Sequence, residues 1–361
     1  MIYLDYSATT KADTKVLNKF TETEEKYFAN PNSNHKLGKE ALNEIKESTK
    51  TITNLLNIKE NELIFTSGAS ESNNMVLKGL NVSHIITTKL EHSSITTPLG
   101  FLQTKNVKID FVNLEESGLI DINHLLSLID DNTKTLISIG AVNSETGLRQ
   151  PIEEIGEKLK KYPNVIFHSD ITQALGKCSF DLTNIDLASF SMHKIFGIKG
   201  IGGLIKKENI KLIPLIHGGK SLSIYRSGTP QTSLITSSSI AIKEAFTNLE
   251  EKYKYVEELN QYLKTNIKDL VTINSSSYSI PHILNISLSN INSEEALEYF
   301  SNNNIFISSK TACSSGNYSQ VVNELYHDIT RAENSIRISI SYKTTKEELD
   351  IFIEKLKELA K

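Results

Sequence analysis

The chain has 361 residues, of which 39% are hydrophobic and 23% are charged, and its formal net charge is -4 at pH 7. These values are typical of a water-soluble globular protein, and the length corresponds to about two domains at roughly 100 to 200 residues each. The acidic balance argues against a general nucleic-acid-binding surface. The sequence contains no apolar run near the ~20 residues that a membrane span requires, which argues against a membrane protein.

The N-terminus and the cysteine content bear on the cellular compartment. The first residues lack the basic segment and apolar stretch of a secretory signal, and the chain has two cysteines, Cys178 and Cys313. We therefore expect a cytoplasmic protein without a disulfide framework. The two cysteines do not have the spacing of zinc ligands, so we predict no metal site.

Short apolar segments alternate with helical patterns between about residues 62 and 207. This alternation predicts an α/β fold with a mostly parallel seven-stranded sheet between helices. Ligands of such sheets bind beyond the carboxyl ends of the strands. The expected strands span residues 63–65, 84–88, 108–114, 135–142, 165–170, 187–193 and 203–206.

A different pattern follows residue 239. A helical stretch over 240–270 precedes two strand-like runs, 283–287 and 336–341, and an amphipathic helix is expected over 345–360. This pattern predicts a smaller α+β domain.

The first expected strand leads into a turn that could bind an anion. The turn, residues 66–70, contains hydroxyl side chains and Gly68, and a helix is expected from Glu71 to Leu80. Backbone amides at a helix N-terminus form an anion site, and glycine permits close approach of a phosphate. Taken alone, this segment could also be an ordinary helix cap.

Two further strands, which we expect to be neighbours, end in ionisable side chains. The strand over 165–170 ends in Asp170, with Gln173 at the start of an expected helix, and the strand over 187–193 leads into Lys194 and a glycine-rich turn. A partly desolvated lysine can attack a carbonyl. Pyridoxal 5'-phosphate (PLP) needs a lysine for its aldehyde and a carboxylate for its ring nitrogen. The alternatives are a solvated lysine and a helix-capping aspartate.

In this order, the three elements resemble the fold-type I PLP enzymes, and more narrowly the cysteine desulfurases of the class V aminotransferase family. The resemblance runs almost end to end. Each motif is weak by itself, but their joint order is specific. The matching segments are 2–10, 30–35, 66–74, 91–92, 143–147, Asp170 with Gln173, 191–194, 226–229, 312–316 and 335–337.

The resemblance implies roles for the residues around the cofactor ring. Lys194 would bond to the PLP aldehyde and move protons at the substrate α-carbon. Asp170 would pair with the ring nitrogen and Gln173 would bond near the phenolic oxygen. His92 would lie flat against the ring, although a lone histidine is more often a satisfied polar residue.

The resemblance also implies a phosphate site shared between subunits. Thr229 would reach the phosphate of a partner subunit, which implies a homodimer; a turn residue beside Gly228 is the alternative. Within one subunit the implied phosphate ligands are the backbone of Ala69 and the side chains of Ser70, Ser191 and His193.

On the substrate side, the resemblance implies a sulfur-accepting cysteine and a carboxylate-binding arginine. Cys313 lies in a small, polar stretch over 312–316, where a thiol would be exposed, although it could be a chance cysteine. Arg337 lies in mid-strand, where a buried charge needs a partner: the substrate carboxylate or a structural salt bridge. Asn143 is assigned to the substrate and Ser144, where the family usually has asparagine, to the cofactor. Cys178 matches no functional position of the family.

The resemblance thus implies a PLP-dependent cysteine desulfurase that converts L-cysteine to L-alanine and carries the sulfur as a persulfide on Cys313. The expected partners are L-cysteine, a second copy of the chain, and a sulfur acceptor such as an iron–sulfur scaffold or a tRNA-thiolation enzyme, without direct contact with nucleic acid or a membrane. The alternatives are a selenocysteine lyase, a class V aminotransferase, or a weakly active sulfur-relay protein. We expect a large domain over 12–240 and a small domain over 241–361 completed by residues 1–11.

Overall fold

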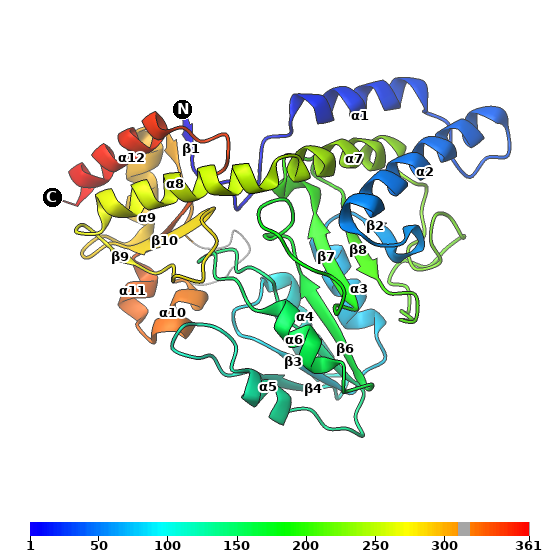
Figure 1. The fold of residues 1–361 in the computed structure, drawn as a ribbon, viewed down its shortest axis with the longest axis horizontal. Coiled ribbons are helices and arrows are strands. Elements are labelled where there is room, and N and C mark those ends of the chain that lie inside the picture. Colours follow the sequence, from blue (N-terminus) through cyan, green and yellow to red (C-terminus); the bar gives the residue numbers. More distant parts are fainter. Residues whose placement is uncertain (310–317, 361) are drawn as a thin grey trace.

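A seven-stranded sheet forms the centre of the computed structural model, which describes residues 1–309 and 318–360 (Figure 1). The strand order is β2-β8-β7-β6-β5-β3-β4. All neighbouring strands run parallel except β8, which is antiparallel to both β2 and β7. The predicted α/β fold is therefore confirmed. The strands span Leu63–Thr66 (β2), His84–Thr87 (β3), Lys108–Phe111 (β4), Thr135–Ser138 (β5), Val165–Asp170 (β6), Leu187–Ser191 (β7) and Gly202–Lys206 (β8).

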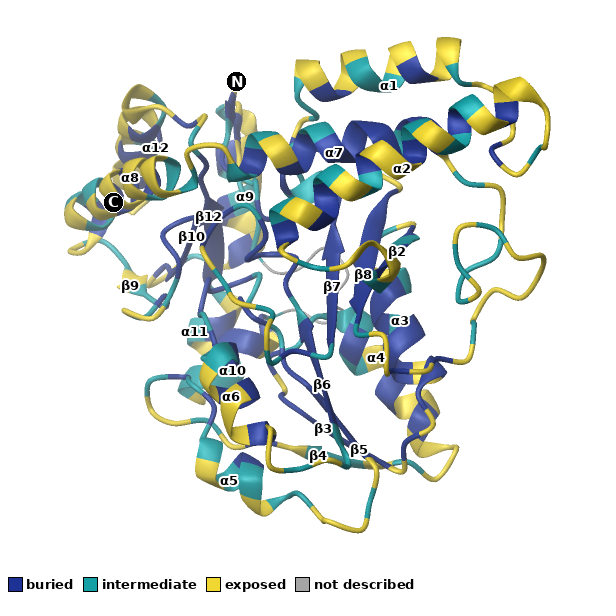
Figure 2. Ribbon diagram, turned by 45° about the vertical axis from the view of Figure 1, so that its right-hand side comes forward, coloured by how far each residue is buried: buried dark blue, intermediate teal, exposed yellow. Residues whose placement is uncertain are grey.

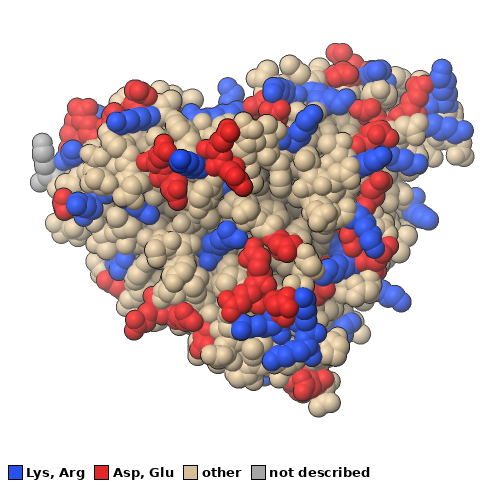
Figure 3. Space-filling model, in the orientation of Figure 1, with Lys and Arg blue, Asp and Glu red and all other residues tan. Residues whose placement is uncertain are grey.

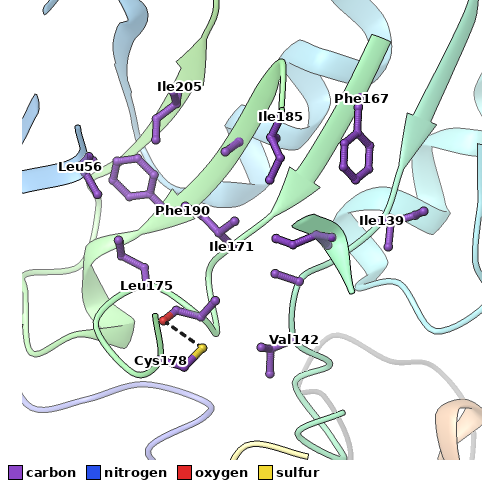
Figure 4. Packing of buried hydrophobic residues seen from close by; sticks show 14 of the residues in the cluster. Leu56, Ile139, Val142, Phe167, Ile171, Leu175, Cys178, Ile185, Phe190 and Ile205 are labelled. Carbon is purple, nitrogen blue, oxygen red and sulfur yellow. Dashed lines mark hydrogen bonds between the residues drawn. The ribbon is translucent and has the colours of Figure 1, made fainter. Parts of the chain in front are cut away.

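Helices cover both faces of this sheet, as expected for strands that are apolar on both sides. On one face, apolar side chains of α3 (Ala69–Gly79) and α4 (Ser93–Gln103) join the sheet in one hydrophobic cluster. On the other face, α2 (Lys36–Leu56), α6 (Ile152–Leu159) and α7 (Thr232–Phe246) do the same. Figure 4 shows this second cluster from close by, with Phe167 of β6 and Phe190 of β7 among its side chains. Two outer helices are α1 (Thr14–Lys26), beside α7, and α5 (Ile122–Ser127).

A smaller antiparallel sheet lies beside the large one, as the sequence predicts. It has the order β12-β10-β9, with β9 at Thr272–Ile273, β10 at Ile283–Ser287 and β12 at Ser335–Ser339. A short parallel pair joins β1 (Ile2–Tyr3) to β11 (Ile305–Phe306). The helices here are α8 (Leu249–Ile267), α9 (Ser293–Asn302), α10 (Gln320–Tyr326), α11 (Ile329–Glu333) and α12 (Lys346–Leu359).

The first residues of the chain belong to the core of this smaller unit. Ile2 and Leu4 share a hydrophobic cluster with α8, α9, α12, β10 and β12. In Figure 1 the blue N-terminal strand accordingly lies among yellow, orange and red segments. The chain then crosses to the large sheet, which places residues 5–10 between the two units.

The helical stretch expected over 240–270 is confirmed, but it consists of two helices rather than one. The first, α7, begins at Thr232 and packs on the large sheet, while α8 belongs to the smaller unit. Asn248 separates them with a left-handed backbone at φ 53°, a conformation that asparagine tolerates better than most residues. Figure 2 shows the change: α7 is mostly buried, whereas α8 is exposed along one side.

Within residues 1–309 and 318–360, the helices fall short of the length and apolar character that crossing a bilayer requires. Figure 3 shows basic and acidic side chains interspersed over one face of the molecule.

Candidate active site

A cavity of about 240 Å³ opens at the carboxyl ends of the large-sheet strands. It collects most of the side chains that the sequence analysis singled out, from segments far apart in the chain. Predicted site residues in its lining are Ala69, Ser70, His92, Asn143, Ser144, Asp170, Gln173, Ser191, His193, Lys194 and Arg337.

Lys194 is held at the end of β7. The strand stops at Ser191, earlier than expected, because Met192–Lys194 form one turn of 3-10 helix. The Nζ atom of Lys194 donates hydrogen bonds to the carbonyl oxygens of Ser7 at 2.6 Å and Ala8 at 2.7 Å. The N-terminal segment therefore orients the lysine within the cavity.

Asp170 ends β6, the strand that pairs with β7, so the two predicted neighbours are confirmed. Its Oδ2 accepts a hydrogen bond from Asn73 Nδ2 at 2.8 Å, and its Oδ1 accepts one from the Thr172 amide at 2.9 Å. The helix expected at Gln173 is wrong, since residues 172–177 form turns. Asp170 thus closes a local turn, and a fully buried asparagine holds the carboxylate in one orientation.

The turn before α3 lies against the end of β7 and the start of β8. The Ala69 amide donates to Ser191 Oγ at 2.7 Å. Gly68 has φ 154°, and a Cβ on Gly202 would lie only 2.7 Å from the Gly68 Cα. This close approach needs glycine, and it brings Ser191 beside the N-terminus of an 11-residue helix, where anions bind well.

Two histidines flank the lysine end of the cavity. His92 caps α4 by accepting from the Ser94 amide at 3.1 Å, and burial lowers its pKa. The imidazole is therefore uncharged at neutral pH, which suits a position against an aromatic ring. His193 Nδ1 bonds with Thr9 Oγ1 at 3.1 Å, and burial together with Lys194 lowers its pKa to about 4.

Glu91 is a site residue to which the sequence analysis assigned no role, although it precedes His92 in a quoted motif. Its carboxylate accepts two hydrogen bonds from the Gly140 amide at 3.1 and 3.0 Å, and one from Thr88 Oγ1 at 2.8 Å. Burial raises its pKa to about 7, and the Asp170 charge contributes. Glu91 links the loop that carries His92 to the end of β5. The only signal in the sequence was its place in that motif.

Arg337 lies in the centre of β12 and is only 1% exposed. Nη1 donates to the Ser144 carbonyl at 2.9 Å, and Nη2 donates to Asp5 Oδ1 at 2.7 Å. The buried Nε has no hydrogen-bond partner among the described residues. The structural salt bridge considered above therefore exists, with an acidic partner that the sequence analysis left unassigned.

The neighbouring loop contains the other two residues of this side. Asn143 Nδ2 donates to the Leu90 carbonyl at 2.8 Å, and Asn143 Oδ1 accepts from the amides of Glu145 at 2.9 Å and Thr146 at 3.0 Å. These bonds engage both ends of the amide within the loop. Ser144 contributes its carbonyl oxygen to Arg337. The substrate role of Asn143 and the cofactor role of Ser144 stay predictions.

Thr229 and Cys178 lie outside the cavity lining. Thr229 is exposed and outside the cavity lining, and Cys313 lies outside the described residues. Cys178 is buried in the apolar cluster, where its Sγ donates to the Ala174 carbonyl at 3.8 Å (Figure 4). Burial raises the pKa of this thiol. Cys178 therefore has the environment of a small core residue.

The side chains in this cavity fit PLP. Lys194, the oriented carboxylate of Asp170 and the neutral imidazole of His92 line one cavity. The N-terminus of α3 and the Ser191 hydroxyl could bind a phosphate there. Asp170 also lines the cavity, where a ring N–H would add a third hydrogen bond to its carboxylate. Lys194, Asp170, His92 and Ser191 would hold the group.

Comparison with known proteins supports the predicted family over nearly the whole chain. Residues 2–352 match the family described as Aminotransferase class-V. The chain is 36% identical to the cysteine desulfurase IscS of Rickettsia bellii, over 98% of this chain and 89% of that protein. A solved structure named NifS-like protein has a TM-score of 0.93 at 31% identity, covering 99% of this chain and 98% of that one.

A third match is the structure titled "SspA in complex with cysteine". Its TM-score is 0.83 at 30% identity, covering 96% of this chain and all (100%) of that one. These matches confirm the resemblance that the motifs carried. The chain belongs to the class V aminotransferase family.

Proposed function

We propose that this protein is a PLP-dependent cysteine desulfurase. The observation that carries the proposal is the joint placement of Lys194, Asp170 and Arg337 around one cavity. The names of the relatives, cysteine desulfurase and a protein in complex with cysteine, support L-cysteine as the substrate.

Each residue of the cavity has its own role in the proposed reaction. Bound PLP supplies an electron sink for negative charge at the substrate α-carbon. Arg337 orients the substrate carboxylate, and Lys194 takes the α-proton and returns a proton to the substrate. Asp170 keeps the ring nitrogen protonated, while His92 packs against the ring.

Cys313 completes the reaction in this proposal. Its thiolate attacks the substrate sulfur, so that an S–S bond forms and the Cβ–S bond of the substrate breaks. The electron pair left on Cβ takes up a proton, which gives L-alanine and a persulfide on Cys313. The substrate carbon is reduced and the sulfur is oxidised, so no external oxidant is needed. The persulfide then passes to an acceptor, either an iron–sulfur scaffold or a tRNA-thiolation enzyme.

Alanine release and sulfur capture test the function together. Wild-type protein mixed with L-cysteine and a reductant should release alanine and sulfide in equal amounts, and protein assayed without reductant should gain one sulfur atom at Cys313 by mass spectrometry. Cys313→Ala should keep the cofactor colour and lose both products. Cys178→Ala is the matched control, because that thiol is buried in the core. Wild-type protein that binds PLP but forms neither product would contradict the proposal.

We also propose that the protein works as a homodimer. Exposed apolar side chains gather on the segment that precedes Thr229, and a groove of about 760 Å³ adjoins it. Covering such side chains favours association. The exposed residues are Ile213, Leu215, Ile216, Leu222 and Ile224. Light scattering that finds a monomer with full PLP occupancy would overturn the dimer.

A further inference from the structure

Lys177 is a buried cation near the candidate active site that the proposed chemistry does not use. The residue is 8% exposed and lies in the turn that follows β6. Gly176 precedes it with φ 65°, and a Cβ there would lie 2.6 Å from the Cβ of Ala245 in α7. The turn therefore depends on a left-handed glycine packed against α7, which sets the position from which Lys177 reaches inward.

Lys177 Nζ donates a hydrogen bond to Gln173 Oε1. An ammonium group can only donate, so the oxygen of the amide faces Lys177 and the NH₂ group faces the other way. Gln173 Nε2 accordingly donates to the carbonyl oxygen of Ser7 at 2.9 Å and to its Oγ at 3.1 Å. Ser7 and Gln173 both line the cavity. A side chain with two possible amide orientations is thus held in one of them.

The hydrogen bonds continue beyond Gln173. Ser7 Oγ donates to the Ser144 carbonyl at 2.8 Å, and that oxygen also accepts from Arg337 Nη1 at 2.9 Å. Two donors lie at the ends of this series: Arg337 at one end, which can only donate, and Lys177 at the other, which can only donate while it is protonated. Protonated Lys177 therefore sets the direction of the bonds between them.

The charge of Lys177 is unfavourable for folding. Burial lowers its pKa to about 7, and the nearby cations Lys194 and Arg337 contribute. Burying a charge costs stability. The lysine at this position is therefore better explained by its hydrogen bond to Gln173 than by a contribution to stability.

We propose that Lys177 is a positioning residue that keeps the NH₂ group of Gln173 directed toward Ser7 at the cavity wall, where one of its N–H groups would exchange Ser7 for the phenolic oxygen of bound PLP. This inference rests on the PLP part of the proposed function. Lys177 itself lies outside the cavity lining and has no contact with substrate in this proposal.

The test is the affinity of the full-length chain, stripped of cofactor, for PLP. Lys177→Met removes the donor and keeps the length of the side chain. We expect the dissociation constant for PLP, followed by visible absorbance, to rise about threefold to tenfold, the range of one hydrogen bond. We also expect a shift of the absorption maximum, and thermal stability equal to or above that of the wild type.

Two further variants separate positioning from a structural effect. In the Gln173→Leu background, Lys177→Met should cause no further loss of PLP affinity, because no amide remains to be oriented. Lys206→Met is the matched control, since Lys206 is a buried lysine that donates to the carbonyls of Lys207 and Ile210, away from the cavity. It should leave the absorption spectrum unchanged.

Unchanged PLP affinity in Lys177→Met, or an equal loss in the Gln173→Leu background, would overturn the inference. If Lys177→Met does not fold, Lys177→Gln is measured in both backgrounds, because a glutamine can also accept and so permits both orientations of Gln173. The readout is cofactor affinity, so it decides this inference whether or not the protein forms alanine from cysteine.

Discussion

Asp5 and Arg337, from opposite ends of the chain, form an ion pair at 2.7 Å at the edge of the candidate active site. Two further hydrogen bonds fix the position of this ion pair. The Ser339 amide donates to the Leu4 carbonyl at 2.7 Å, and the Ser7 amide donates to Ser339 Oγ at 2.9 Å. These bonds hold the N-terminal segment along β12, so the buried guanidinium has a carboxylate partner before any substrate arrives.

We expect loss of this pair to weaken substrate binding. Asp5→Ala removes a charge-assisted bond worth about 2 kcal/mol, which frees the guanidinium to change orientation. The KM for L-cysteine should rise about tenfold with a smaller change in kcat, whereas Asp5→Asn, which keeps an acceptor oxygen, should lose less.

The matched control for this prediction is Glu244→Ala, which breaks a surface ion pair with Lys15. Exposed pairs contribute little, so its KM should match the wild type. An Asp5→Ala enzyme with unchanged KM would show that Arg337 does not depend on Asp5.

Lys194→Ala should abolish stable cofactor binding. The variant removes the amine that would bond to the PLP aldehyde, so gel filtration should leave it colourless. It also removes the two hydrogen bonds to the Ser7 and Ala8 carbonyls, so we expect lower thermal stability of the cofactor-free protein. Lys199→Ala, at an exposed lysine of the glycine-rich turn, should remain yellow. A coloured Lys194→Ala protein would assign the aldehyde to another lysine.

Glu91 predicts a pH dependence of stability. The unfolded chain releases this proton near pH 4.5, whereas the folded chain holds it to about pH 7. Between these values the native state binds more protons, so its stability falls as pH rises, and the loss remains above pH 7. In Glu91→Gln the free energy of unfolding should fall less between pH 5 and pH 8 than in the wild type.

Denaturant unfolding of the cofactor-free protein at both pH values measures the difference. Glu298→Gln, at an exposed glutamate of α9, should follow the wild-type pH dependence. Parallel curves for all three proteins would show that Glu91 is ionised throughout.

Gly202→Ala should damage the turn before α3. An added Cβ would lie 2.3 Å from the Phe190 carbonyl oxygen and 2.7 Å from the Gly68 Cα, both backbone atoms. We expect a loss of about 1 to 3 kcal/mol in unfolding free energy and weaker PLP binding. Gly100→Ala, in α4 with open space around it, should be neutral or stabilising. Equal stability of the two variants would contradict the close packing.

The sequence was sufficient for the parts of the site that follow from local pattern. Apolar strands alternating with helices predict a parallel sheet, and parallel strands end at one edge, so Asp170 and Lys194 had to come close once their strands were neighbours. The Gly68 turn followed for the same reason. Local pattern did not reveal the break at Asn248, because apolar residues continue on both sides of it.

The contacts that orient these residues were decided by the tertiary structure. Three of these contacts join segments that lie far apart in the sequence and share no local sequence pattern. They are the bond from Lys194 to the Ser7 carbonyl, the ion pair of Arg337 with Asp5, and the bond from Asn73 to Asp170. Burial is likewise a property of the folded chain, and it gives Lys177 and Glu91 their shifted pKa values. The amino-acid sequence by itself determined which chemical groups the site contains. Only the folded chain decided which partner holds each group and which charges lie away from water, because both depend on contacts between distant segments.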